Sequence, residues 1–243
     1  MSTAEPIEHS TSKPNPRILL LLFGFGLLGE ISAGSALPDA LGADYRESPA
    51  LFLAASVAGI CAVASAAVLA VGLILKKQGL GLSAVGLGPA NALRAAAVGV
   101  SWYLLFLPMV VASGVLVITI LHLAGLPVPS SRIQEIMLYA LKNKEALCLF
   151  LVMIAVAGPV LEEILFRGLL FTALRQKLSF GPAAVVSAST FALLHPMVYW
   201  LPVAILGFML ALVYEREKSL LPAIIAHSVH NGLIFLFTMY VLK

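Results

Sequence analysis

The stretch Glu162-Glu163-Ile164-Leu165-Phe166-Arg167 places three charged residues inside one of the most apolar regions of the chain. The segment just before it, from Leu149 to Leu161, carries no charge, and the segment after it continues as Gly168-Leu169-Leu170-Phe171. Ionisable side chains at membrane depth cost free energy, usually face the protein interior and mark functional sites. The stretch therefore predicts a buried polar cluster on a membrane helix.

Helical spacing separates the roles of the three charges. Glu163 and Arg167 are i and i+4, so they share a face and can neutralise each other, with the acid on the favourable N-terminal side. Glu162 lies about 100° further round the helix and needs a partner from another helix. The plainer interpretation is a buried salt-bridge cluster that holds helices together. The functional interpretation makes Glu162 an acid/base group, with the neighbouring pair as its support.

The composition indicates a polytopic membrane protein. Hydrophobic residues make up 60% of the 243 residues and charged residues only 11%, against about a quarter charged in soluble domains. The net charge of +3 indicates no nucleic-acid partner. The two cysteines, Cys61 and Cys148, are interpreted as small apolar residues of the spans.

The fold class predicted is all-α, a bundle of seven or eight transmembrane helices in one domain, because open strands cannot cross lipid. Residues 1–16 are predicted to be a disordered tail and residues 17–243 the single membrane domain. The apolar segments are 18–28, 50–75, 95–123, 146–174, 182–196, 201–214 and 220–242. The long third segment is expected to be tilted, and an eighth span would come from dividing it or the N-terminal region.

The N-terminal segment has one alternative interpretation. The run from Ile18 to Leu28, followed by Ala33-Gly34-Ser35, also resembles a cleaved signal peptide. We expect a retained span, because the apolar character continues past Glu30 and more spans follow. Glu30 itself is expected at the membrane interface.

The basic residues favour one orientation. One set of segment ends carries the larger share, namely Lys13, Arg17, Lys76, Lys77, Arg94, Arg175, Lys177, Arg216 and Lys218. The richer side should be cytoplasmic, which predicts a multi-pass integral membrane protein with a cytoplasmic N-terminus and membrane lipid as its surroundings.

Polar groups in the last spans can complete a site around Glu162. Phe191 and His195 share a helix face, and so do His227 and Asn231. His230 is i+3 from His227, and geometry alone leaves it open. Each histidine alone could be a satisfied polar residue that links helices. In one small bundle, however, these groups must all be hidden from lipid, which favours a common pocket.

Such a pocket has the groups for amide hydrolysis without a protein nucleophile. A carboxylate and a histidine can position and deprotonate a water, while a histidine and an asparagine can donate hydrogen bonds to an oxyanion. His-Glu-x-x-His and Gly-x-Ser-x-Gly are both absent from the sequence. Two histidines and a glutamate are also a known zinc ligand set; spacing leaves this alternative open.

Three motifs resemble those of the CPBP family, the CAAX prenyl proteases and bacteriocin-processing enzymes. The motifs are Glu162-Glu163-x-x-x-Arg167, Phe191-x-x-x-His195 and His227-x-x-x-Asn231. The resemblance covers residues 146–242 and implies an all-helical intramembrane peptidase. It implies that Glu162 and His195 activate water, that His227 and Asn231 form the oxyanion site, and that Glu163, Arg167 and Phe191 are supporting residues.

The resemblance leaves the cofactor and the substrate open. The family is often labelled as metalloproteases, yet its best-understood members resemble glutamate-dependent enzymes, so no cofactor is expected. With zinc bound, the ligands would be Glu162, His195 and His227. The expected substrate is a membrane-anchored or lipidated protein or peptide. The alternative function is a non-catalytic membrane protein, a bacteriocin immunity factor or a proton-coupled transporter, that uses the same polar cluster.

Overall fold

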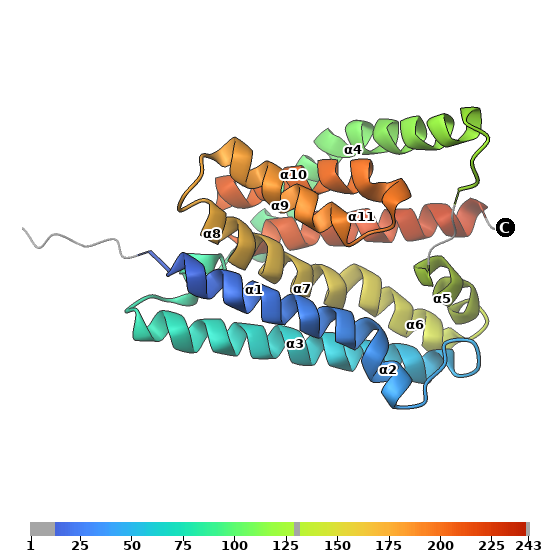
Figure 1. Ribbon diagram of the computed structural model, residues 1–243, viewed down its shortest axis with the longest axis horizontal. Helices are drawn as coiled ribbons and strands as arrows, with labels where there is room; N and C mark the ends of the chain where they lie inside the picture. Colours follow the sequence, from blue (N-terminus) through green and yellow to red (C-terminus); the bar gives the residue numbers. More distant parts are fainter. Residues whose placement is uncertain (1–12, 129–131, 242–243) are drawn as a thin grey trace, which may run out of the picture.

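The computed structural model describes residues 13–128 and 132–241, and these ranges are helical with no β-strand (Figure 1). The all-α prediction is thereby confirmed. The predicted disordered tail falls almost entirely on residues 1–12, which lie outside the described residues; residues 13–15 precede the first helix.

Eleven α-helices make up the described chain, joined in places by π- and 3₁₀-helical segments. They are α1 (Pro16–Ile31), η1 (Ser32–Ala36), α2 (Leu37–Ala40), α3 (Pro49–Lys77), η2 (Leu82–Val85), α4 (Ala92–Leu123), α5 (Arg132–Ala140), α6 (Lys144–Val152), η3 (Met153–Ala157), α7 (Gly158–Glu163), η4 (Ile164–Phe171), α8 (Thr172–Leu174), α9 (Phe180–Leu193), η5 (Met197–Tyr199), α10 (Trp200–Glu217) and α11 (Leu220–Val241).

Asparagine residues define where three of the helices begin. The side chains of Asn15, Asn91 and Asn143 accept hydrogen bonds from backbone N–H groups in the first turns of α1, α4 and α6. The first N–H groups of a helix have no partner within the helix, so an accepting side chain at this position stabilises the helix end.

Six described segments are long and apolar enough to cross a membrane, so the predicted count of seven or eight is not confirmed. The segment that differs is α9, an apolar helix of 14 residues. Its length of about 21 Å falls short of a hydrocarbon core of about 30 Å. The helix ends at Leu193, just before His195-Pro196, and α10 then returns antiparallel beside it (Figure 1).

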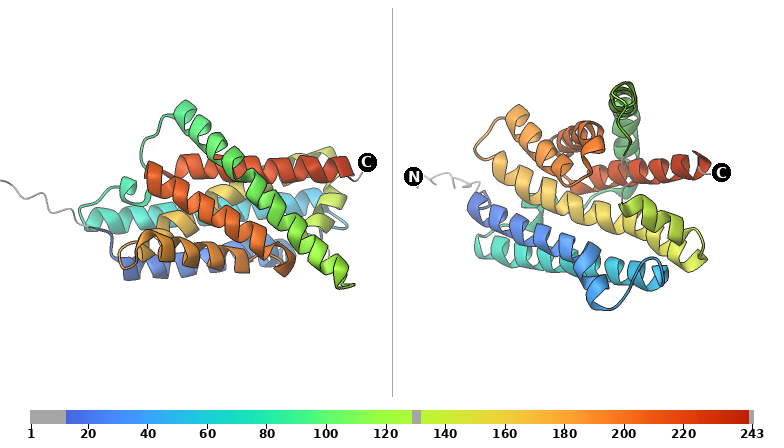
Figure 2. Two further views of the ribbon diagram at one scale, coloured as in Figure 1. Left: turned by 90° about the horizontal axis from the view of Figure 1, so that it is seen from above. Right: turned by 45° about the vertical axis from the view of Figure 1, so that its right-hand side comes forward.

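The predicted tilt of the third apolar segment agrees with the position of α4. At 32 residues, α4 is about 48 Å long, and Figure 2 shows it crossing the other helices obliquely. Only 11% of its most apolar window is buried, against 44% for the segment from Lys144 to Leu174. The segment from Lys144 to Leu174 is therefore the more central of the two.

The helices form two groups on either side of this central segment. In Figure 1, α1 and α3 lie below it, and α4, α9, α10 and α11 lie above it. Two helices of the upper group approach closely where Gly207 of α10 meets Ala188 of α9: a Cβ at Gly207 would lie 3.1 Å from the Cα of Ala188. This contact brings α10 near enough for its backbone to reach the site.

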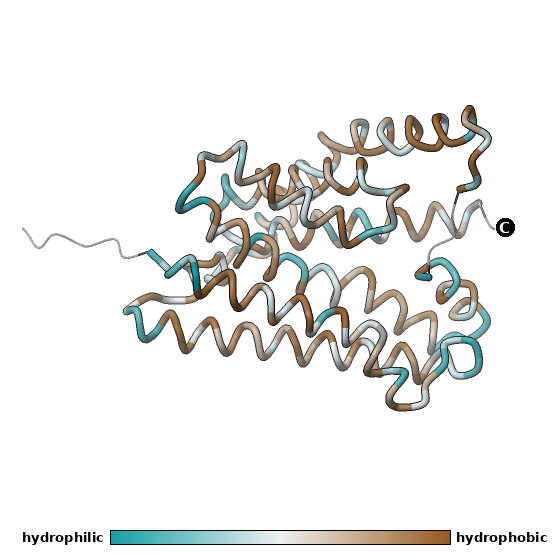
Figure 3. The backbone as a smooth tube through the Cα atoms, viewed as in Figure 1, coloured by the Kyte–Doolittle hydropathy of each residue, from teal (hydrophilic) through white to brown (hydrophobic). Residues whose placement is uncertain are grey.

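Hydropathy is distributed as a membrane bundle requires. Figure 3 shows hydrophobic residues along the helices and hydrophilic ones mainly at their ends. The short helix α5 buries Ile136, Met137 and Ala140. Next to it, the Tyr45 hydroxyl donates to Glu135 over 2.8 Å, and this hydrogen bond raises the pKa of Tyr45.

Candidate active site

Before the acidic motif, a π-helical turn and Pro159 leave one backbone carbonyl without a helical hydrogen-bond donor. At the end of η3, the N–H of Gly158 bonds to the carbonyl of Met153, five residues back. The next residue, Pro159, has no N–H. The carbonyl of Ile154 therefore lacks both of its usual helical donors and needs a partner from outside.

Asn231 of α11 supplies that partner. Its side-chain Nδ2 donates to the Ile154 carbonyl over 2.7 Å. This hydrogen bond connects α11 to η3, about two helical turns before the acidic motif. Segments of π-helix are rare and frequently occur at functional sites, and here one lies on each side of α7.

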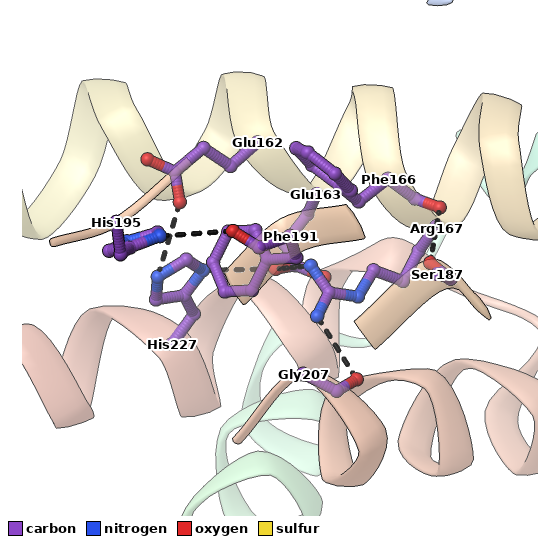
Figure 4. A network of polar contacts seen from close by, with 9 residues as sticks. All are labelled: Glu162, Glu163, Phe166, Arg167, Ser187, Phe191, His195, Gly207 and His227. Atoms are coloured by element: carbon purple, nitrogen blue, oxygen red, sulfur yellow. Dashed lines mark hydrogen bonds and ion pairs between the residues drawn. The ribbon is translucent and has the colours of Figure 1, made fainter. Parts of the chain in front are cut away.

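Glu163 and Arg167 form the predicted ion pair, and both side chains are fully buried. Arg167 Nη1 donates to Glu163 Oε1 over 2.8 Å, and Nη2 donates to the Gly207 carbonyl over 3.1 Å (Figure 4). The guanidinium also lies over the Phe191 ring, 4.9 Å from its centroid. Backbone, ring and carboxylate together fix the position of Arg167, because a buried cation is stable only with such partners.

His227 lies between the two glutamates. Its Nδ1 is 2.9 Å from Glu163 Oε1, and its Nε2 is 3.4 Å from Glu162 Oε2 (Figure 4). The second contact is an ion-pair distance without hydrogen-bond alignment, since Oε2 of Glu162 has no hydrogen-bond partner among the described residues. The resemblance pairs Glu162 with His195 for water activation; the ion-pair contact that Glu162 makes among the described residues is with His227.

His195 follows the C-terminal end of α9, with its Nδ1 3.0 Å from the Phe191 carbonyl. A carbonyl only accepts hydrogen bonds, so this contact places the hydrogen on Nδ1 and leaves Nε2 as an acceptor. An imidazole in this form can take a proton from water. The backbone carbonyl of His195 accepts from Trp200 Nε1 over 2.9 Å, which fixes the loop that holds the ring.

Phe191 joins the two histidines into one site. Its ring, only 1% exposed, contacts the His195 ring at 4.9 Å and the His227 ring at 5.7 Å between centroids. Both imidazoles therefore pack on one aromatic ring that also contacts Arg167. Six of the seven motif residues are thus connected by contacts among α7, η4, α9 and α11, while the side chain of Asn231 bonds to the Ile154 carbonyl.

His230, which the sequence spacing left open, is separate from this cluster. Its Nδ1 lies 3.3 Å from the Tyr103 hydroxyl of α4, and the two rings are 5.7 Å apart. The contact links α11 to α4.

The sequence interpretation missed three participants. The carbonyls of Ile154 and Gly207 carry no sequence signal of their own, although Pro159 could have indicated the first. Glu30 was expected at the interface, but the helix continues past it through η1 into α2, and its Oε2 is buried.

The described residues do not fit a zinc site. No group of three or more His, Cys, Asp or Glu side chains within them is arranged to hold a metal ion. Of the conditional zinc ligands, His227 has its Nδ1 bonded to Glu163, and its Nε2 lies 3.4 Å from Glu162 Oε2. We therefore assign no step to a metal.

Comparison with known proteins identifies the region that contains this site. A family model described as "Type II CAAX prenyl endopeptidase Rce1-like" matches residues 144–233. This part of the chain is similar to CAAX prenyl endopeptidases, which are among the CPBP proteases that the three motifs resemble. The match lies almost entirely within the predicted range 146–242, and it contains every motif residue named above. Together with six apolar helices of sufficient length, it indicates an integral membrane protein.

Two curated relatives are each similar to part of the chain. The chain is 31% identical over 96 residues to the putative membrane peptidase YdiL of Bacillus subtilis (strain 168), a stretch that is 39% of this chain and 39% of that protein. It is 34% identical over 98 residues to the membrane-embedded CAAX protease MroQ of Staphylococcus aureus (strain USA300), which is 37% of this chain and 40% of that protein. The similarity thus spans about two fifths of each relative. No solved structure matches the chain.

Proposed function

We propose that this protein is an intramembrane endopeptidase that hydrolyses a peptide bond in a membrane-anchored or lipidated protein or peptide. The observation that carries the proposal is the contact of His227 with both glutamates of the motif, in a region that matches a CAAX prenyl endopeptidase model. A cluster built only for stability would be complete with the Glu163–Arg167 pair. Glu162 lies outside that pair, and its side chain is 20% exposed.

Glu162 and His195 act on the attacking water. The water oxygen bonds to the carbonyl carbon of the peptide, and its proton passes to this pair. The C–N bond then breaks, and the same proton is given to the departing amine nitrogen. His195 suits this task because its Nδ1 is held by the Phe191 carbonyl, which leaves Nε2 to accept.

His227 and Asn231 stabilise the oxyanion that forms at the peptide carbonyl. The Asn231 amide carries two hydrogens, of which the Ile154 carbonyl takes one. The second amide hydrogen of Asn231 and an Nε2–H of His227 are the donors proposed for the oxyanion. Because Nδ1–H of His227 donates to Glu163, the ring can also donate from Nε2 only when both of its nitrogens carry a hydrogen. Glu163 orients His227 through Nδ1, and Arg167 keeps Glu163 in place.

The setting suggests where the substrate comes from. A site formed by apolar helices favours peptides that are already held in the membrane, and the two relatives are named as a membrane peptidase and a CAAX protease. Activity is proposed to need no metal. The excess of basic residues at one end of the bundle supports a cytoplasmic N-terminus.

Cleavage by the purified protein tests the proposal. The full chain in detergent is incubated with two internally quenched peptides, one farnesylated and ending in a CAAX sequence and one carrying an uncleavable acyl anchor. We expect the wild type to cleave at least one, and Glu162→Gln to be folded and inactive. The matched control is Glu145→Gln, which removes an exposed carboxylate from the first turn of α6. Equal cleavage by wild type and Glu162→Gln would refute the mechanism, and absence of cleavage of both peptides would favour a non-catalytic role.

A further inference from the structure

Glu30 lies on the buried face of α1 and not on its lipid face. The buried residues Leu19, Gly26 and Ala33 recur at intervals of seven along α1 and η1. Glu30 is four residues after Gly26 and three before Ala33, which places it on the same helical stripe. The exposed apolar residues Phe25 and Leu28 lie on the other side.

The register between α1 and the central helix brings Glu30 to Glu162. The two helices run antiparallel and side by side (Figures 1 and 2). The Phe23 ring packs against the Phe166 ring at 5.3 Å, and Gly26 lies so close to Leu165 that a Cβ there would collide with that side chain. One turn further along α1 is Glu30, and one turn back along the central helix is Glu162.

The two carboxyl groups interact electrostatically, and each has an unsatisfied oxygen. Two carboxylates brought together by this register would repel each other if both were ionised. Oε2 of Glu30 and Oε2 of Glu162 are both buried without a hydrogen-bond partner among the described residues. Unpartnered polar oxygens at membrane depth are costly. A proton held between the two carboxyl groups would remove the repulsion and give both oxygens a hydrogen bond.

We propose that Glu30 is a positioning residue for the reaction, whose carboxyl group holds Glu162 in place through a hydrogen bond between the two side chains. This inference rests on the proposed function, but Glu30 lies on α1, outside the matched residues 144–233. The site is therefore completed by a helix that the family match does not include. Glu30 acts on the water only through Glu162.

Three variants of the full chain separate positioning from a structural role. Glu30→Leu removes the hydrogen bond and should lower kcat about 10- to 100-fold, the range for a hydrogen bond to a charged group. KM should stay within about twofold, since Glu30 does not contact the substrate. Glu30→Gln keeps a donor of the same length and should retain kcat within about threefold. Glu47→Ala, which removes an exposed carboxylate from the following loop, is the control and should equal wild type.

A double-mutant cycle based on unfolding midpoints provides a readout that is independent of activity. Unfolding midpoints are measured for wild type, Glu30→Leu, Glu162→Gln and the double variant in one detergent. Side chains in contact give non-additive changes, which is the result expected. Additive changes, or wild-type kcat in Glu30→Leu, or equal loss of kcat in Glu30→Gln and Glu30→Leu, would overturn the inference. If the wild type cleaves neither peptide, the proposed function fails while the cycle still decides whether Glu30 holds Glu162.

Discussion

Replacement of Glu163 by glutamine should destabilise the protein far more than replacement of a surface partner at the same distance. Arg167 is fully buried, and Glu163 is the only carboxylate bonded to it in the described chain. The Gly207 carbonyl and the Phe191 ring contact the guanidinium but carry no formal charge. Removal of one partner of a buried pair costs about 3–5 kcal/mol. At about 2–4 °C per kcal/mol for a chain of this size, the unfolding midpoint should fall by roughly 10 °C.

The matched control is Glu217→Gln. Glu217 pairs with Arg94 over 2.9 Å, almost the same distance as the 2.8 Å of the buried pair, but the Arg94 side chain is 72% exposed. Exposed pairs contribute about 0–1 kcal/mol, so this midpoint should fall by no more than about 4 °C. The double variant Glu163→Leu with Arg167→Met removes both charges and should recover much of the stability. It should not recover turnover, because His227 loses its partner at Nδ1.

The measurement is thermal unfolding of the purified variants in one detergent, followed by the loss of the monodisperse fraction after heating. Peptide cleavage is measured on the same samples at a temperature where all of them remain folded. If Glu163→Gln and Glu217→Gln unfold at the same temperature, the buried pair is not the stabilising element described above, and its role would have to be chemical.

Three further predictions concern the rest of the site. Asn231→Ala should lower turnover about 10²–10³-fold, the usual effect of losing one oxyanion donor, with binding of an uncleaved substrate nearly intact; a wild-type rate would remove Asn231 from the oxyanion site. His230→Ala should change turnover only a few-fold and cost about 1 kcal/mol of stability, because it loses the single hydrogen bond to Tyr103; a folded but inactive variant would contradict this. Chelation should leave turnover unchanged, whereas stoichiometric zinc, with activity lost on chelation and restored by zinc, would show that a metal takes part.

Much of the fold follows from local sequence properties. Hydropathy alone indicates a helical membrane bundle, because only helices and closed barrels satisfy the backbone in lipid. The pairing of Glu163 with Arg167 also follows, since residues four apart on a helix must be neighbours. Hydropathy does not predict the length of α9. The apolar segment extends to Pro196, but the helix ends at Leu193 and the chain turns back as α10.

Only the tertiary structure decides which groups meet between helices. The position of His227 between two glutamates depends on the register of α11 against α7, and the contact of Asn231 depends on the Ile154 carbonyl left free before Pro159. The burial of the Glu30 carboxyl oxygen depends on how closely Gly26 approaches Leu165. Periodicity defines the face on which a residue lies, whereas small residues and unpaired backbone groups define how far one helix slides along another.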